Sequence, residues 1–200
     1  MTNRHGNLQK HLNPNPIQRR LLARFHHRVL ALMAQIEPGT ILDAGCGEGF
    51  TLHELETAPQ LSPTQTAGID FSLTALHWNR ANHMTGTPLA QADVHQLPFP
   101  DNSFDLVYCL EVLEHLPDSA LGLAELVRVS RQYVLVSVPH EPLFRAANFL
   151  RGKHLSALGN DPEHLHNYTG LTFRRLVRQQ VDLLWHGYAF PWQIALGQKQ

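Results

Sequence analysis

The residues best suited to chemistry are an acid and a set of glycines within one short stretch, Thr40–Gly49. An apolar run leads into Asp43, and three glycines follow at alternating positions, namely Gly45, Gly47 and Gly49. An apolar strand that enters a glycine-rich turn is typical of nucleotide binding by α/β sheets, because glycine lets ligand atoms approach the backbone closely. Dinucleotide sites use G-x-G-x-x-G, whereas the spacing here is G-x-G-x-G with an acid just before it. That acid would repel a pyrophosphate and attract an ammonium or a ribose hydroxyl, which favours a nucleoside bearing an amino group.

Two further acids are expected at the ends of the following strands. Asp70 closes the segment Gln65–Asp70, and Asp93 follows the weak strand Pro88–Ala92. Since parallel strands deliver their carboxyl ends to one edge of a sheet, Asp43, Asp70 and Asp93 should lie near one another. A carboxylate at the position of Asp70 can accept hydrogen bonds from both ribose hydroxyls.

With these motifs the chain resembles the class I S-adenosylmethionine-dependent methyltransferases, over roughly residues 38–140. The run Phe104–Leu116 is similar to the fourth-strand motif of members that act on small molecules, lipids and quinones. The resemblance implies that Gly45 and Gly47 line the methionine portion and that Asp43 lies near its amino group. It also implies that Asp70 holds the ribose, that Asp93 and Val94 meet the adenine, and that Phe71 packs on its face. The complete implied cofactor set is Asp43, Gly45, Cys46, Gly47, Asp70, Phe71, Asp93, Val94, Leu110 and Glu111.

A second constellation follows the fourth strand. Glu111-x-x-Glu114-His115 with the later His164 resembles the metal site of small-RNA 2′-O-methyltransferases and of some quinone O-methyltransferases. That likeness implies a Mg²⁺ site at Glu111, Glu114, His115 and His164, with His166 the second match for the distant ligand. Mg²⁺ prefers oxygen ligands, so two histidines would favour Mn²⁺. The alternative is that no metal is bound, because the sequence Val-Leu-Glu-His-Leu is frequent in methyltransferases that use none.

Two histidines are candidate catalytic residues, and each follows a predicted strand or loop at the ligand edge. His140 comes directly after the fifth strand and could act as a base, with a plain surface histidine as the alternative. His164 is the second candidate, at the end of the long connection 140–169. Connections of that length are usually functional, so 140–169 is predicted to be a lid or part of the acceptor site.

The elements that must position these residues alternate between helix and strand. Helices are expected at Pro16–Ile36, Phe50–Ala58, Ser72–Asn82, Ala120–Ser130 and Leu171–Gln180; strands at Thr40–Ala44, Gln65–Asp70, Pro88–Ala92, Phe104–Leu110 and Tyr133–Val138. This order predicts an α/β fold with a doubly wound, mostly parallel, Rossmann-like sheet in a single domain. Residues 1–16 are expected to be a loose arm before a methyltransferase domain at 17–200. Val181–Leu196 is expected to form one or two closing strands. It leaves little room for the full sixth and seventh strands usual in the methyltransferase fold, which predicts a sheet shortened at one edge or completed by a partner.

Composition narrows the class of partner. The 200 residues are 43% hydrophobic and 16% charged, as in a soluble globular protein, and the formal net charge is −1. No global basic field is available to recruit nucleic acid. No apolar run approaches the roughly 20 residues of a membrane span, and no signal peptide or metal-type cysteine pair is evident, so a cytoplasmic location is expected.

These observations lead to four function hypotheses. The first is an S-adenosylmethionine-dependent methyltransferase that acts on a small-molecule or lipid-like acceptor, at oxygen. The others are a metal-assisted RNA 2′-O-methyltransferase, a non-catalytic cofactor-binding scaffold, and a nicotinamide-dependent reductase, which the glycine spacing disfavours.

Overall fold

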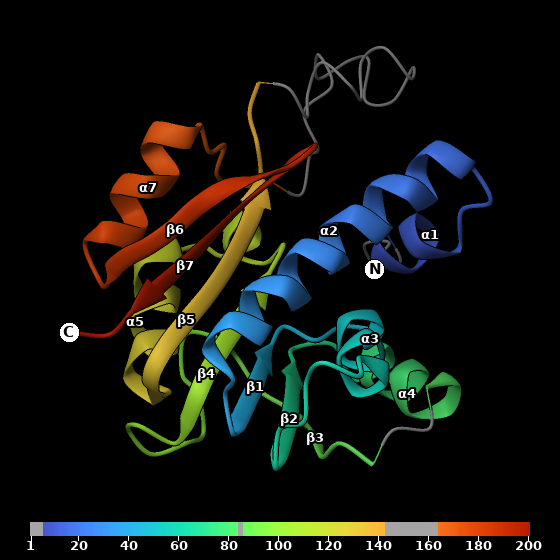
Figure 1. The fold of residues 1–200 in the computed structure, drawn as a ribbon, viewed down its shortest axis with the longest axis horizontal. Helices are drawn as coiled ribbons and strands as arrows, with labels where there is room; N and C mark the ends of the chain where they lie inside the picture. The colour runs from blue at the N-terminus through green and yellow to red at the C-terminus, as the bar shows by residue number, and fades with distance from the viewer. Residues whose placement is uncertain (1–5, 84–85, 143–163) are drawn as a thin grey trace.

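The computed structural model describes residues 6–83, 86–142 and 164–200, and it contains one seven-stranded sheet (Figure 1). The helices are α1 (Gly6–Leu12), α2 (Pro16–Ile36), α3 (Phe50–Thr57), α4 (Leu73–Asn82), α5 (Ser119–Val129) and α7 (Gly170–Arg178), with a short 3₁₀ turn η1 (Leu113–His115). The strands are β1 (Thr40–Ala44), β2 (Gln65–Asp70), β3 (Leu89–Gln91), β4 (Phe104–Leu110), β5 (Ser130–Pro139), β6 (Asp182–Ala189) and β7 (Trp192–Gln198).

The strand order is β3-β2-β1-β4-β5-β7-β6, and β1 to β5 run parallel. Only β7 runs against its neighbours, β5 and β6. This confirms the predicted doubly wound, mostly parallel sheet. The strand order switches sides between β1 and β4: β2 and β3 lie on one side of β1, and β4 and β5 lie on the other. Such sheets bind ligands at their carboxyl edge at this switch point.

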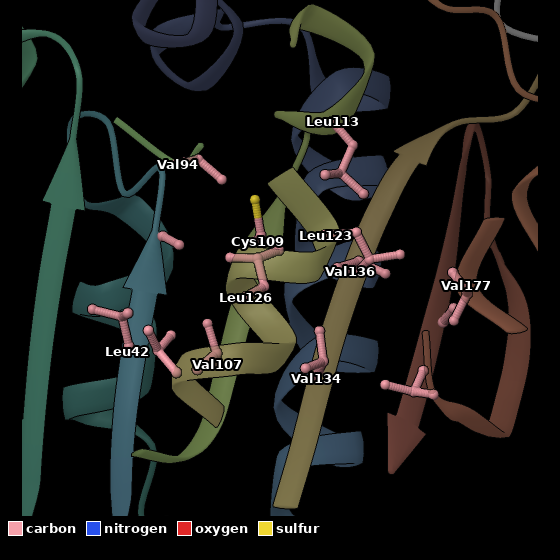
Figure 2. Close-up of a cluster of buried hydrophobic side chains, with 14 of the residues drawn as sticks. Leu42, Val94, Val107, Cys109, Leu113, Leu123, Leu126, Val134, Val136 and Val177 are labelled. Atoms are coloured by element: carbon pink, nitrogen blue, oxygen red, sulfur yellow. The ribbon is translucent and has the colours of Figure 1, made fainter. Parts of the chain in front are cut away.

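The central strands are buried on both faces, which explains their apolar runs. On one face, Ile41 and Leu106 pack with α2 and α3. On the other face, Leu42 and Val107 lie in a cluster with Leu123 and Leu126 of α5 (Figure 2). The same cluster includes side chains of α7. Because successive strand residues point to opposite faces, one strand supplies both clusters.

The prediction of a shortened sheet is wrong. Residues 182–198 form two long antiparallel strands, joined by only Phe190 and Pro191. A two-residue connection uses so little chain that β6 and β7 both fit, and all seven strands come from this one chain.

The expectation of a loose arm also differs from the structure over its described part. Residues 6–12 form α1, which folds back beside the start of α2 (Figure 1). The amide of Gln18 donates to the carbonyl of Lys10 at 2.7 Å, and Asn15 caps α2 through the backbone N–H groups of Ile17 and Gln18. The polar residues that suggested a loose arm form a helix, and polar contacts hold that helix in place.

Candidate functional site

The glycine turn wraps over the carboxyl end of β2. The backbone N–H groups of Gly45 and Cys46 both donate to the carbonyl of Ile69, at 2.8 and 2.9 Å. The three glycines adopt positive φ angles, 88° at Gly45, 51° at Gly47 and 80° at Gly49. At Gly45 a Cβ atom would lie 2.4 Å from Val112 Cγ2, so this position requires glycine on two counts.

Asp70 ties this turn to the end of β2. Its Oδ2 accepts from the backbone N–H of Gly47 at 2.8 Å, and its Oδ1 accepts from that of Ser72 at 2.7 Å. Two backbone donors fix the orientation of the carboxylate. Phe71 follows directly after β2, with 58% of its surface exposed.

Asp43 is nearly fully buried at the end of β1, 3% exposed. Burial raises the pKa of its carboxyl well above the usual range. The neighbouring Tyr108 hydroxyl lowers this pKa, and the charge of Asp70 raises it further. Cys46 is also buried, and burial followed by the charge of Asp43 raises the pKa of its thiol. The thiol is therefore a packing group, since only a thiolate is a good nucleophile.

Asp93 lies in an exposed turn after β3, and Val94 beside it is buried. Its Oδ1 accepts from the backbone N–H of His95 at 2.9 Å and lies 2.8 Å from the Nδ1 atom of the same residue. These contacts, the backbone hydrogen bond foremost, lower the pKa of Asp93 and keep it a carboxylate. The sequence reasoning missed His95, although its place two residues after a strand-end acid was a usable signal.

Leu110 ends β4, half-buried, and the chain then turns at Glu111, whose φ is +59°. The Ser137 hydroxyl donates to Glu111 Oε1 at 3.0 Å, and Lys10 Nζ lies 3.7 Å from Glu111 Oε2. Burial raises the pKa of Glu111, and the charge of Lys10 opposes that shift most strongly. A non-glycine residue in this conformation is costly and is found preferentially at functional sites.

Three of the four predicted metal ligands come together. Glu114, His115 and His164 offer ligand atoms that all lie within 4.8 Å of one another. They meet because the backbone carbonyl of Glu114 accepts from the N–H groups of Leu165 and His166, at 2.8 and 3.1 Å. Glu111 is not in this group, and the His166 ring is turned away, with Nε2 3.0 Å from the Leu116 carbonyl oxygen. One carboxylate and two imidazoles form a donor set that suits Mn²⁺ or Zn²⁺ better than Mg²⁺.

His140 follows β5 at the same edge as the glycine turn. Its backbone N–H donates to the carbonyl of Pro191 at 2.9 Å, and its ring meets that of Tyr188 edge-on, with centroids 4.8 Å apart. Burial lowers the pKa of His140, so the imidazole is neutral at pH 7 and able to take a proton. The predicted lid at 140–169 falls mostly on residues 143–163, which lie outside the described residues.

With this geometry in place, comparisons with known proteins give consistent results. Residues 42–136 match the family model described as a methyltransferase domain. Cycloartenol-C-24-methyltransferase 1 of Oryza sativa subsp. japonica is 36% identical over 107 residues, covering 52% of this chain and 31% of the relative. Fatty-acid O-methyltransferase of Mycolicibacterium smegmatis is 32% identical over 102 residues, covering 50% and 36%. The chain thus matches only about a third of the length of these relatives.

The fold is also that of a solved structure with a bound product. Magnesium protoporphyrin IX methyltransferase from Synechocystis PCC 6803, crystallised with S-adenosylhomocysteine (SAH), superposes with a TM-score of 0.70. The match covers 96% of this chain and 92% of that one at 16% identity, so the likeness is one of fold. Within the described residues, no helix is long and apolar enough to cross a bilayer.

Proposed function

Because the chain belongs to the class I S-adenosylmethionine-dependent methyltransferases, we propose that it transfers a methyl group to a small-molecule or lipid-like acceptor, at oxygen. The observation that carries the proposal is the glycine turn tied to Asp70, with Asp43 and Asp93 at the neighbouring strand ends. Relatives named for a sterol precursor and for a fatty acid support an acceptor of this kind. The oxygen assignment rests on the fatty-acid relative and on His140.

The cofactor would lie along this edge. The turn at Gly45 and Gly47 would receive its methionine portion, with Asp43 at the end of β1 near the amino group. The fixed carboxylate of Asp70 accepts from the ribose hydroxyls, and Asp93 with Val94 and Phe71 receives the adenine. Cys46 and Leu110 line the same edge. The bound cofactor supplies an activated methyl carbon, so the chain contributes alignment and exclusion of water.

His140 is the proposed base for a hydroxyl acceptor. Its imidazole accepts the hydroxyl proton as the oxygen takes the methyl group, and the methyl–sulfur electron pair leaves with sulfur. A neutral imidazole is required for this role, and burial of His140 favours that form.

The cluster Glu114, His115 and His164 supports a second candidate, a metal-assisted transfer to a hydroxyl, as in methylation of an RNA 2′-oxygen. These three side chains would hold the ion, and His164 would then be a ligand rather than a base. Mn²⁺ titration followed by electron paramagnetic resonance tests this site directly, with Glu114→Gln and His164→Asn as variants. Micromolar binding lost in both variants supports the site, whereas equal binding in wild type and variants rejects it.

Calorimetric titration with SAH tests the cofactor proposal. Wild type should bind at micromolar concentration, and Asp70→Asn should weaken binding at least tenfold, about 1.4 kcal/mol. Asp182→Asn, at the start of β6 and remote from this edge, is the matched control and should bind as wild type does. Absence of binding in wild type would reject the methyltransferase function in favour of a scaffold.

A further inference from the structure

Helix α1 lies against the carboxyl edge of the sheet, and three of its side chains each contact a different segment there. The amide of Asn7 donates to Glu48 Oε2 in the glycine turn at 2.7 Å. The His11 ring stacks on that of Phe50 at the start of α3, with centroids 4.0 Å apart and planes 3° from parallel. Between them, Lys10 reaches toward Glu111.

The ammonium group of Lys10 is held by two different kinds of partner. Its Nζ lies 3.7 Å from Glu111 Oε2 and 4.7 Å from the centroid of the Trp192 ring. Glu111 exposes 18% of its side chain and Trp192 only 3% of its surface, so both partners are shielded from bulk water. A carboxylate and an aromatic face that converge on one point are the recognition elements for an ammonium ion.

The two receiving side chains lie at the sheet and are held by contacts with residues other than Lys10. Glu111 directly follows β4 and is anchored by Ser137, whose Cα partner in β7 is Ile194. Trp192 opens β7 opposite Pro139 of β5 and packs on Phe25 of α2, with ring centroids 4.9 Å apart.

Lys10, by contrast, comes from a helix of seven residues. Helices shorter than about 12 residues are marginal by themselves, so α1 stays in place only through its contacts with the domain. The ammonium is therefore brought in by a short helix, while the carboxylate and the ring are held by contacts with the sheet and with α2.

The location connects this pair to the cofactor site. Val112, which follows Glu111, lies against Gly45, where a Cβ would approach Val112 Cγ2 to 2.4 Å. Glu111 therefore stands beside the turn that is proposed to hold the methionine end of the cofactor.

We propose that Glu111 and Trp192 form an ammonium subsite for the methyl acceptor, and that Lys10 fills it as an internal stand-in for that ligand. The assignment of the ligand as the acceptor rests on the proposed methyltransferase function. The acceptor class is a small molecule that carries an ammonium group. That group serves recognition, because a protonated nitrogen has no lone pair with which to accept a methyl group. Binding of the acceptor displaces Lys10 and with it α1.

The test uses tetramethylammonium as probe, the full chain, and the indole N–H signal of Trp192 in ¹H–¹⁵N spectra, assigned with Trp192→Phe. Lys10→Met keeps the aliphatic stem and removes the charge, so it should bind the probe at least tenfold more tightly than wild type. Adding Glu111→Gln to Lys10→Met should abolish that gain. The uncharged isostere tert-butanol should not shift the signal in any variant.

Arg28→Met is the matched control, because Arg28 makes a comparable cation–aromatic contact elsewhere, 5.5 Å from the centroid of the Trp185 ring. It should leave the Trp192 signal and the probe affinity unchanged. The proposal is overturned if Lys10→Met binds SAH as wild type does yet binds tetramethylammonium no better than tert-butanol. If wild type fails to bind SAH, the methyltransferase function fails, while the probe titration still decides whether the subsite exists.

Discussion

The two halves of the carboxyl edge are built in different ways. The half proposed to bind the cofactor (the cofactor half), at the ends of β1 to β3, depends on backbone groups: positive-φ glycines, N–H donors to Ile69, and Asp70 on the N–H of Gly47. The half proposed to bind the acceptor (the acceptor half), at the ends of β4 and β5, consists of side chains from distant segments, among them Lys10, Glu111 and Trp192. Backbone geometry tolerates little change, whereas a set of side chains can be altered one member at a time.

The comparison predicts the largest effect at the glycine turn. Gly45→Ala would force a side chain onto Val112 at a φ of 88°, so it should lower the free energy of unfolding by about 3 kcal/mol and abolish SAH binding. Gly86→Ala is the control, since a Cβ there meets no atom within 4 Å. Urea denaturation measures both. Equal stability of the two variants would contradict a backbone-built cofactor half.

A smaller effect is expected at His140 in the acceptor half. His140→Gln should lower kcat/KM about 100-fold while SAH affinity stays unchanged. Because burial lowers the pKa of His140, wild-type kcat/KM should rise with pH through a midpoint below the ordinary histidine value and then level off. The variant should lack this rise. Tyr188→Phe keeps the ring contact and serves as control; an identical pH profile in wild type and His140→Gln would reject the base.

The attachment of α1 to the rest of the domain should weaken as the pH falls. Burial, and next the charge of Lys10, lower the pKa of His11 to about 3, from about 6.5 in the unfolded chain. A depressed histidine pKa contributes stability that is present above 6.5 and is lost as pH falls toward 3. Hydrogen exchange in α1 should therefore accelerate, relative to β4, as pH is lowered from 7 to 5. His11→Phe keeps the stack on Phe50 and should remove this difference; its persistence would assign the acid sensitivity elsewhere.

The smallest effect should come from the anchor of Glu111. Ser137→Ala removes the hydroxyl that donates to Glu111 Oε1, which should cost about 1 kcal/mol of unfolding free energy. SAH affinity should be kept, because the cofactor half is independent of this hydroxyl. Ser103→Ala, at a partly exposed turn, is the comparison variant. A loss of SAH binding in Ser137→Ala would show that the two halves are coupled.

The cofactor half could be predicted from local sequence because its requirements are local. The glycine spacing and the strand-end acids Asp43, Asp70 and Asp93 are read within a few residues, and the structure brings them to neighbouring strand ends. Strand boundaries at β1, β2 and β4 also match the predictions, since each strand is an apolar run bounded by turn residues. Where boundaries differ, as at Ser130–Pro139, a strand continues through polar residues that pair at the rim of the sheet.

The acceptor half could not be predicted in the same way. The spacing of Glu111, Glu114 and His115 predicted a common metal site, but the left-handed turn at Glu111 directs its carboxylate to Ser137 and Lys10 instead. Lys10 carried no local signal, because it belongs to a short polar segment that becomes a helix only on contact with the domain.

The sequence by itself therefore determined the fold class, the glycine turn and the acids around it, because hydrophobic periodicity and backbone conformation are properties of neighbouring residues. Only the tertiary structure decided that β6 and β7 complete the sheet, that His164 meets Glu114, and that Lys10 lies between Glu111 and Trp192. Such pairs depend on how distant segments pack once the sheet has formed. No spacing along the chain records that arrangement.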